Sequence, residues 1–411
     1  MAIATESDTG TRDGDAPRRV PRNVVLLGVV SLFADISSEM VYPLIPLFLT
    51  ASLGAPVAAV GLIEGVAEST ASLLKWYFGW FSDRIRRRVP FTFAGYTLAA
   101  IAKPALAAAY VWPVALFVRF LDRTGKGVRT APRDALIAES TDQSQRGRAF
   151  GLHRAMDTSG AIVGPLAALG LLAWFGGQNY RPIFLIAAIP GAISVLLVLF
   201  VREVRHTPRT GPLPPLLSFR GYDRRFYQFV AVTLLFSVGN SSDAFLILRS
   251  KDVGLGATAI VLAYVLYNIA YAALSLPAGI RSDRIGRRPV LVAGFAIFAT
   301  VYVGFALATN GWMIWPLFIV YGAYIAFTEG VGKAYVSDLV PAERRGAALG
   351  VYNASLGVMM LLSSVIGGGL WSLIGPAATF AFGASTATAA ALLLLMLNPG
   401  SEHGRADVAA A

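Results

Sequence analysis

Apolar stretches of about twenty residues recur along the entire chain, with short polar or basic connections between them. As an α-helix, each stretch is long enough to cross a hydrocarbon layer roughly 30 Å thick. Lipid offers no hydrogen-bonding partner to a free backbone amide or carbonyl, so a segment that crosses it in this way must be helical. The pattern predicts an all-α polytopic membrane protein, which fits a chain that is 55% hydrophobic and only 14% charged.

Twelve transmembrane helices are predicted, and a Pro-rich basic stretch divides them into two sets of six. We therefore expect two pseudo-symmetric six-helix bundles. The polar first 22 residues contain no apolar core, so we expect no cleaved signal peptide and expect the first span to direct insertion. The predicted spans are residues 24–48, 58–81, 90–110, 112–133, 149–174, 182–201, 227–249, 258–280, 289–309, 312–338, 347–373 and 376–397. The predicted divisions are a cytoplasmic N-terminal tail (1–22), a first bundle (23–201), a cytoplasmic linker (202–226), a second bundle (227–397) and a C-terminal tail (398–411).

The formal charge of +11 is concentrated in alternate connections between the predicted spans, whereas the intervening connections carry almost no charge. This asymmetry follows the positive-inside rule and predicts that both termini face the cytoplasm of a cell (inner) membrane. A basic charge distributed in this way indicates contact with the lipid bilayer and not with nucleic acid. The basic clusters are Arg18, Arg19 and Arg22, residues 84–88, Arg146 and Arg148, residues 202–225, residues 281–288, and Arg344 and Arg345.

Several classes of function are excluded by the composition and motifs. The chain contains no cysteine, which excludes disulfides and thiolate metal sites. The fragments "GKG" (125–127) and "GVGK" (330–333) lack the spacing of a nucleotide-binding P-loop, which argues against ATP-driven pumping. No metal-ligand cluster or nucleophile–base constellation stands out in the sequence. We therefore expect a protein that is not an enzyme and uses no metal or cofactor. As a separate expectation, the protein is a monomer.

One basic segment of ten residues occurs twice, 200 residues apart, and the two copies are identical at seven positions. Internal repeats on both sides of a midplane site are a common construction of secondary transporters. The basic residues alone would serve as a topology anchor, but the repeated glycine and aspartate are not needed for charge bias and favour a repeated hinge. The repeated pairs are "GWFSDRIRRR" (79–88) with "GIRSDRIGRR" (279–288), "LFADISSEM" (32–40) with "LFSVGNSSD" (235–243), and "QRGRAFG" (145–151) with "RRGAALG" (344–350).

"GIRSDRIGRR" matches the G-x-x-x-D-R-x-G-R-R signature of the major facilitator superfamily completely, and "GWFSDRIRRR" matches it except that Arg86 replaces glycine. With its two sets of six spans, the whole chain resembles that superfamily. The resemblance implies two bundles that rock around a central cavity, and contacts between acidic and basic loop residues that hold one conformation and release in the other. The residues implied in this conformational hinge are Gly79, Asp83, Arg84 and Arg87, and Gly279, Asp283, Arg284 and Arg287.

"GAIVGPLAAL" (160–169) on the fifth predicted span partly resembles the g-x-x-x-G-P-x-x-G-G signature of proton-coupled exporters. Gly160, Gly164 and Pro165 match that signature, and its last two glycines are replaced. These residues predict a kinked, closely packed helix that belongs to the hinge set. On the fourth span, "TGKGV" resembles a second exporter pattern, but Leu121 stands at the position of the expected arginine and Arg119 lies two residues earlier.

Ionisable side chains within the predicted spans are concentrated in the first half, and such groups mark function by default because they are costly in a bilayer. Asp35 and Glu39 are four residues apart and share a helical face, and Glu64 and Glu68 repeat this spacing on the second span. A basic stripe follows on the fourth span, formed by Arg119, Arg123, Lys126 and Arg133. The predicted proton-coupling and substrate cavity comprises Asp35, Glu39, Glu64, Glu68, Arg119, Asp122, Arg123, Lys126, Arg154, Asp157, Asn240, Asp243, Tyr267, Asn268 and Glu329.

The second half has different residues at the corresponding positions. Tyr264 and Asn268 stand where the first half has Glu64 and Glu68, and they offer an aromatic face and hydrogen bonds instead of charge. We therefore predict that the first half couples ions and the second half shapes the substrate pocket. Glu329 and Lys333 are four residues apart on one helix and form a pair in the simplest interpretation.

Two interpretations of the buried charges stay open. The charges either form a salt-bridge network that only orders the bundle, or they line an aqueous cavity in which some bind substrate and one or more carry protons. Because buried ion pairs stabilise a fold inefficiently, the cavity is preferred. The proton candidates are Asp35, Glu39 and Glu68, followed by Asp157. His153 is either a proton relay or a solvated residue facing a loop.

The sequence therefore predicts a secondary active transporter that works by alternating access. A proton gradient is the expected energy source, and export of a small organic compound is the preferred direction. The alternative is proton-linked import of a polar or anionic metabolite, which the basic stripe on the fourth span favours. A third possibility, a membrane sensor or enzyme subunit that transports nothing, does not explain the two repeated hinge segments.

Overall fold

The computed structural model describes the chain in five ranges, and every regular element within them is a helix, with no strand. This confirms the prediction of an all-helical protein. The C-terminal tail, most of the N-terminal tail and most of the linker fall outside the described residues, so those predicted divisions stay predictions. Arg86 of the first motif copy also falls outside them. The described ranges are 20–85, 87–142, 145–204, 221–341 and 344–397.

The helical segments overlap the predicted spans, with ends that differ by up to six residues. In the first half the elements are α1 (Arg22–Val41), η1 (Tyr42–Leu44), α2 (Ile45–Leu47), η2 (Phe48–Ser52), α3 (Val57–Ile85), α4 (Val89–Ala107), α5 (Trp112–Glu139), α6 (Arg146–Phe175) and α7 (Tyr180–Val198). In the second half they are α8 (Arg224–Gly239), α9 (Ala244–Asp252), α10 (Ala257–Ile285), α11 (Arg287–Leu307), η4 (Gly311–Met313), α12 (Ile314–Asp338), α13 (Arg345–Leu373) and α14 (Pro376–Leu397).

Ten helices in the described ranges are long and apolar enough to cross a membrane. The predicted third and fourth spans, which correspond to α4 and α5, are not among them. Both carry charge that the fold turns inward: Lys103 on α4 and Arg119 and Arg123 on α5 are buried. Inward-facing charge lowers the apolar character of a helix without exposing the charge to lipid.

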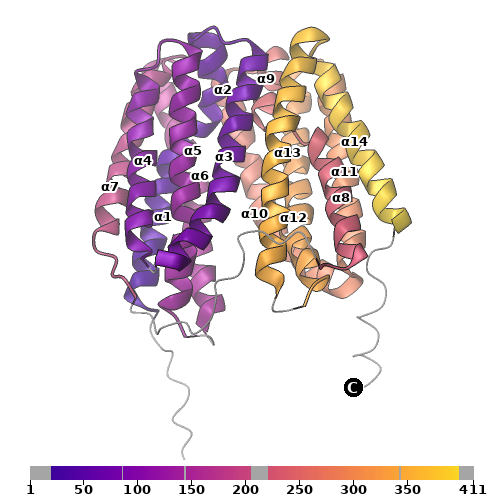
Figure 1. Cartoon of the computed structure of the whole chain (residues 1–411). Helices are drawn as coiled ribbons and strands as arrows, with labels where there is room; N and C mark the ends of the chain where they lie inside the picture. The colour runs from indigo at the N-terminus through magenta and orange to yellow at the C-terminus, as the bar shows by residue number, and fades with distance from the viewer. Residues whose placement is uncertain (1–19, 86, 143–144, 205–220, 342–343, 398–411) are drawn as a thin grey trace, which may run out of the picture.

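The helices gather into two groups that lie side by side (Figure 1). In the first group α1 packs against α6 and α7, and α4 packs against α5 and α7. In the second group α11 packs against α12 and α14, and α8 packs against α14 and α13. The two most extensive contacts between the groups are α3 along α13 and α10 against α6.

The contact between α3 and α13 is close because small residues face each other along it. A Cβ atom built at Gly65 of α3 would lie 3.1 Å from the carbonyl oxygen of Leu361, and one built at Gly368 of α13 would lie 3.1 Å from the Cα of Ala58. Small residues allow membrane helices to approach backbone to backbone. This contact therefore joins the two groups along much of their length.

The two ends of the molecule differ. We call the end that carries the two repeated segments, Gly79–Arg88 and Gly279–Arg288, the motif end, and the other the far end. At the far end one apolar cluster contains residues from both halves, including Leu44, Phe48, Ile247 and Val261. The burial of these side chains closes the far end between the two groups of helices.

The first helix of each half is interrupted near its middle. After Val41 the chain continues as the short 3-10 turn η1, and after Gly239 residues 240–243 separate α8 from α9. Pro43 lies at the start of η1, where a proline removes a backbone donor and prevents a continuous α-helix. Interrupted helices at corresponding places in two halves are a typical feature of binding sites in transporters.

Candidate functional site

A cavity of about 470 Å³, which we call the central cavity, lies between the two halves at these helix breaks. Phe229, Leu291 and Tyr352 also line it, and they lie near the motif-end starts of α8, α11 and α13. The cavity therefore extends toward the motif end, and the apolar cluster covers it at the far end. Its polar and charged lining includes Glu39, Tyr42, Glu68, Arg123 and Lys126 from the first half, and Asn240, Asp243, Tyr264, Tyr267, Tyr321, Tyr324 and Glu329 from the second.

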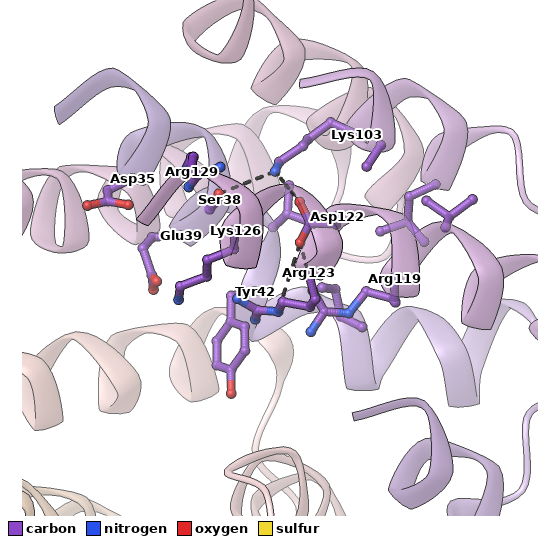
Figure 2. A pocket seen from close by; sticks show the side chains of 15 residues that line it. Asp35, Ser38, Glu39, Tyr42, Lys103, Arg119, Asp122, Arg123, Lys126 and Arg129 are labelled. Carbon is purple, nitrogen blue, oxygen red and sulfur yellow. Dashed lines mark hydrogen bonds and ion pairs between the residues drawn. The ribbon is translucent and has the colours of Figure 1, made fainter. Parts of the chain in front are cut away.

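A second, smaller cavity of about 30 Å³ lies within the first half, and we call it the inner cavity (Figure 2). Its volume suits about one or two water molecules and no organic substrate. Glu39, Tyr42, Arg123 and Lys126 line both cavities. These four side chains thus form a shared wall between a space of water size and a space of ligand size.

Arg119 of α5 forms a bidentate ion pair with Glu64 of α3. Its Nη2 atom donates to both carboxylate oxygens at 2.9 and 2.8 Å, and its Nε donates at 3.1 Å. Both side chains are almost fully buried, at 3% and 1% exposure. Two parallel charge-assisted hydrogen bonds fix the geometry of such a pair and offset part of the cost of burying it.

Asp122 and Glu68 are also paired. The Nζ of Lys103 on α4 lies 2.7 Å from Oδ1 of Asp122, and Nη2 of Arg123 lies 2.9 Å from Oε1 of Glu68. Lys103 also donates to the hydroxyl of Ser38 at 3.2 Å (Figure 2). Our sequence analysis missed Lys103. Its position inside the third predicted span was the signal that could have identified it, because a charge within a membrane helix marks a functional position.

Four charged side chains at the inner cavity remain outside these pairs. In the described part of the chain, Asp35, Glu39, Lys126 and Arg129 form no ion pair within 4 Å. The carboxyl group of Asp35 on α1 faces that of Asp157 on α6 within hydrogen-bonding reach. Two carboxyl groups this close are most stable when they share one proton. The fold therefore singles out Asp35 and Glu39 as acids that no base contacts within 4 Å, and it places beside Asp35 a second acid, Asp157, which Arg154 contacts at 3.4 Å.

The glycines of the fifth predicted span make this approach possible. A Cβ atom at Gly160 would lie 2.8 Å from the Cβ of Asp35, and one at Gly164 would lie 2.9 Å from the Cβ of Glu39. These separations are shorter than side chains tolerate, so only glycine allows α6 to lie this near α1. Pro165 follows within α6 and is buried. The "GAIVGP" segment is thus packed against the two acids of the first span.

In the described part of the chain, two hydrogen-bonded links between side chains cross between the halves, in addition to the bond of 3.1 Å from the Ala58 amide to the Ser372 hydroxyl. The hydroxyl of Tyr264 on α10 donates to Oε2 of Glu39 at 3.0 Å. Nearer the motif end, Nη2 of Arg154 donates to the hydroxyl of Tyr271 at 2.8 Å, and that hydroxyl donates to Glu329 at 2.9 Å. The side chain of Arg154 is 60% exposed, so the second link lies where water reaches it. Glu329 also pairs with Lys333 at 2.9 Å, as its spacing predicts.

The second half supplies hydroxyl and amide groups around the helix break. Asp243 accepts a hydrogen bond of 2.7 Å from the hydroxyl of Tyr321, and the amide of Asn240 donates to Tyr324 at 2.9 Å. Tyr267 lines the cavity, whereas Asn268 donates to the carbonyl of Tyr264 in its own helix and is not part of the lining. Our sequence analysis missed Tyr321 and Tyr324, because tyrosines on an apolar helix give no signal of which face they occupy.

His153 is buried and bonded within the first half. Its Nε2 atom lies 2.9 Å from the hydroxyl of Ser31, which in turn lies 3.2 Å from the hydroxyl of Tyr96. Arg133 donates to the same Ser31 hydroxyl at 3.0 Å. The alternative that His153 is a solvated residue facing a loop is therefore wrong.

The first repeated segment is held by Arg88, and not by the arginines that the family resemblance points to. Nη1 of Arg88 lies 2.7 Å from Asp83, and Nη2 lies 2.6 Å from Glu139 at the end of α5. Burial alone would lower the pKa of Arg88, but the hydrogen bonds to Glu139 and Asp83 outweigh it and raise that pKa. Arg84 and Arg87 are exposed.

The second repeated segment uses Arg287 in the same way. Arg287 pairs with Asp283, and its Nε donates to Asp338 at the end of α12 at 3.0 Å. Gly286 has a φ of +92°, a conformation that suits glycine, and it allows α11 to begin at the next residue, whereas α4 begins only at Val89. This shorter connection explains why the pairing arginine sits one position earlier. Arg284 and Gly279 lie near the end of α10, as Gly79 does on α3, and Arg284 is exposed.

The amino-acid sequence matches the family model of the Major Facilitator Superfamily over residues 27–249 and 229–410. An uncharacterized MFS-type transporter of Methanocaldococcus jannaschii is 35% identical over 94% of this chain and 97% of its own length. The class C tetracycline resistance protein of Escherichia coli is 28% identical over 84% of this chain and 87% of its own length.

Solved structures show the same fold at low sequence identity. A POT family transporter in complex with 5-aminolevulinic acid superimposes with a TM-score of 0.76 at 15% identity. The match covers 92% of this chain and 96% of that structure.

Proposed function

Because the chain belongs to the major facilitator superfamily and is a small-molecule transporter, not an enzyme, we propose that it works by alternating access and couples proton movement to export of a small organic compound. The proposal includes twelve spans in two six-helix bundles, with α4 and α5 crossing the membrane among the other helices. The inward-facing charge of these two helices supports this arrangement. The alternating pattern of basic connections supports an inner-membrane location with both termini in the cytoplasm. We also propose that the protein acts as a monomer.

The closed far end and the cavity that extends toward the motif end support alternating access. In the proposed cycle this conformation opens to the cytoplasm, and a second conformation opens the far end as the motif end closes. The apolar cluster around Leu44 and Ile247 would separate in that step. Rocking of one bundle against the other requires small-residue contacts that slide, which the glycines of α3 and α13 provide.

The observation that carries proton coupling is the bond between Tyr264 and Glu39 at the shared wall. Glu39 belongs to the first half, lines both cavities and holds a residue of the second half. A proton that reaches Asp35 or Glu39 removes one negative charge beside Lys126 and weakens the attraction of Glu39 for the Tyr264 hydroxyl. Proton binding in the first half would thereby change a contact between the two halves.

The pairing of the basic stripe supports export of an organic compound over import of an anion. Arg119 and Arg123 already face Glu64 and Glu68, and Arg133 pairs with Asp134 at 2.8 Å. Few of the stripe's charges therefore remain for an anionic substrate. The name of the tetracycline resistance protein, a relative at 28% identity, also favours export.

Proton flux in proteoliposomes tests the proposal. The purified chain is reconstituted, a pH gradient is imposed, and an internal dye reports pH while cationic, neutral and anionic compounds are added in turn. Inward proton movement linked to efflux of a compound supports the proposal. Uptake of an acid together with protons supports the alternative, and an absence of compound-dependent proton movement with folded protein contradicts both.

A further inference from the structure

Asp243 is an acid without a base. It lies between α8 and α9, lines the central cavity, and accepts a hydrogen bond from Tyr321. In the described part of the chain it forms no ion pair within 4 Å, and two further acids, Glu39 and Glu68, line the same cavity. A partly buried carboxylate in such surroundings attracts a positive charge from outside the protein.

The wall around Asp243 consists of tyrosine rings. Ring centroids follow one another at 5.8 Å from Tyr42 to Tyr264, 5.3 Å to Tyr267, 5.5 Å to Tyr321 and 5.2 Å to Tyr324. All five rings line the same cavity. The faces of aromatic rings carry partial negative charge and bind ammonium groups, which is how proteins recognise amines and quaternary cations.

The charges of the central cavity do not cancel. Glu68 is paired with Arg123 and Glu329 with Lys333, so these acids are compensated. Two unpaired acids, Glu39 and Asp243, remain against one unpaired base, Lys126. The lining therefore has one negative charge in excess, and that charge lies on the tyrosine side of the cavity.

We propose that the central cavity binds an organic cation, with its ammonium group between Asp243 and the tyrosine rings and its apolar body against Phe236, Phe295 and Met360. This inference rests on the proposed function, because it names the substrate class of the same transporter. The volume of about 470 Å³ suits an organic ion better than a bare metal ion. Since a cation and a proton cancel the same excess negative charge, the two compete, which favours exchange of one for the other.

Equilibrium binding tests this assignment with two small probes. Benzyltrimethylammonium is a permanent cation, and phenylmethanesulfonate carries the same benzyl group on an anion. Each is titrated calorimetrically into the full chain in nanodiscs, with empty nanodiscs subtracted. We expect saturable binding of the cation and at least about tenfold weaker binding of the anion.

Variants measure separately how the charge of Asp243 and the tyrosine rings contribute to cation binding. Asp243→Asn should weaken cation binding about tenfold, and Asp243→Glu should restore most of it. Tyr267→Phe keeps the ring and should bind as the wild type does, whereas Tyr267→Leu should lose affinity. Size-exclusion chromatography of each variant checks that it is folded.

Three results would overturn the cation site: no saturable binding of the cation, equal binding of the anion, or an Asp243→Asn variant that binds as tightly as the wild type. None of them affects the proton-flux assay, which is run with compounds of every charge. Compound-dependent proton flux without cation binding would therefore remove the substrate class and leave the transport proposal intact. Absence of flux for every compound would remove the transport proposal itself.

Discussion

Oε2 of Glu39 accepts a hydrogen bond of 3.0 Å from the hydroxyl of Tyr264, and this bond joins α1 of the first half to α10 of the second. Tyr264 occupies the position that Glu64 occupies in the first repeat. Glu64 turns into its own half to bind Arg119, whereas Tyr264 reaches across to the other half. Corresponding positions of the two repeats thus both bind a charged side chain. Glu64 binds one in its own half, and Tyr264 binds one in the other half.

Removal of the Tyr264 hydroxyl tests this bond. Tyr264→Phe keeps the aromatic ring, so substrate exchange should continue while the number of protons moved per substrate falls, by about tenfold if the charge-assisted bond contributes about 1.5 kcal/mol to coupling. Parallel fluxes of protons and labelled substrate measure this ratio. Tyr77→Phe, at a half-exposed ring on α3, is the matched control. A wild-type ratio in Tyr264→Phe would show that the bond has no part in coupling.

The close approach of α6 to α1 predicts the effect of a larger residue. Gly160→Leu should force α6 away from Asp35 and destabilise the protein by about 1–3 kcal/mol, with loss of transport. Gly170→Leu on the same helix is the control, since no atom of another described helix lies within 4 Å of a Cβ built there. Thermal unfolding in detergent compares the two, and equal unfolding midpoints would contradict the packing at Asp35.

The Arg119–Glu64 pair predicts a non-additive effect on stability. Glu64→Ala leaves Arg119 charged and buried with only its longer contact to Asp122 at 3.3 Å, which should cost about 3–5 kcal/mol. The double variant Glu64→Leu with Arg119→Met replaces the pair by apolar groups and should recover most of that loss. Thermal unfolding of both variants provides the comparison. A double variant as unstable as Glu64→Ala would mean that the pair is not the source of the cost.

The contacts of Arg88 predict which arginine of the first repeated segment matters. Arg88→Ala removes the bonds to Asp83 and Glu139 and should lower stability by about 1–2 kcal/mol and reduce transport. Arg87→Ala should have little effect because Arg87 is exposed. Transport assays on the two variants decide between the structure and the family signature. A larger loss in Arg87→Ala would favour the signature.

The helices could be predicted from the sequence because the length of a membrane span is set by the bilayer. Twenty apolar residues bounded by polar ones admit one conformation in lipid, so the boundaries of α3 or α14 follow from composition alone. The separation of four residues along one helix likewise indicated that Glu329 and Lys333 form a pair.

The details of the candidate site could not be predicted in the same way. Pairing of Lys103 with Asp122 depends on the angle between two helices, which residue spacing within one helix does not specify. Arg88 replaces Arg87 because the α3–α4 connection is longer than its counterpart at Gly286, a difference of chain geometry. Pro43 was a sequence signal for the interruption after Val41, but our sequence analysis treated 24–48 as one continuous span, and the matching interruption after Gly239 has no such proline.

The most direct test of the account is transport by Asp35→Asn in proteoliposomes, measured as accumulation driven by a pH gradient and as exchange without a gradient. Asparagine has the size of aspartate and cannot take up a proton, so gradient-driven accumulation should disappear while exchange and folding are retained. If Asp35→Asn accumulates substrate against its gradient as the wild type does, protons are not coupled through the Asp35–Asp157 pair, and the account is wrong.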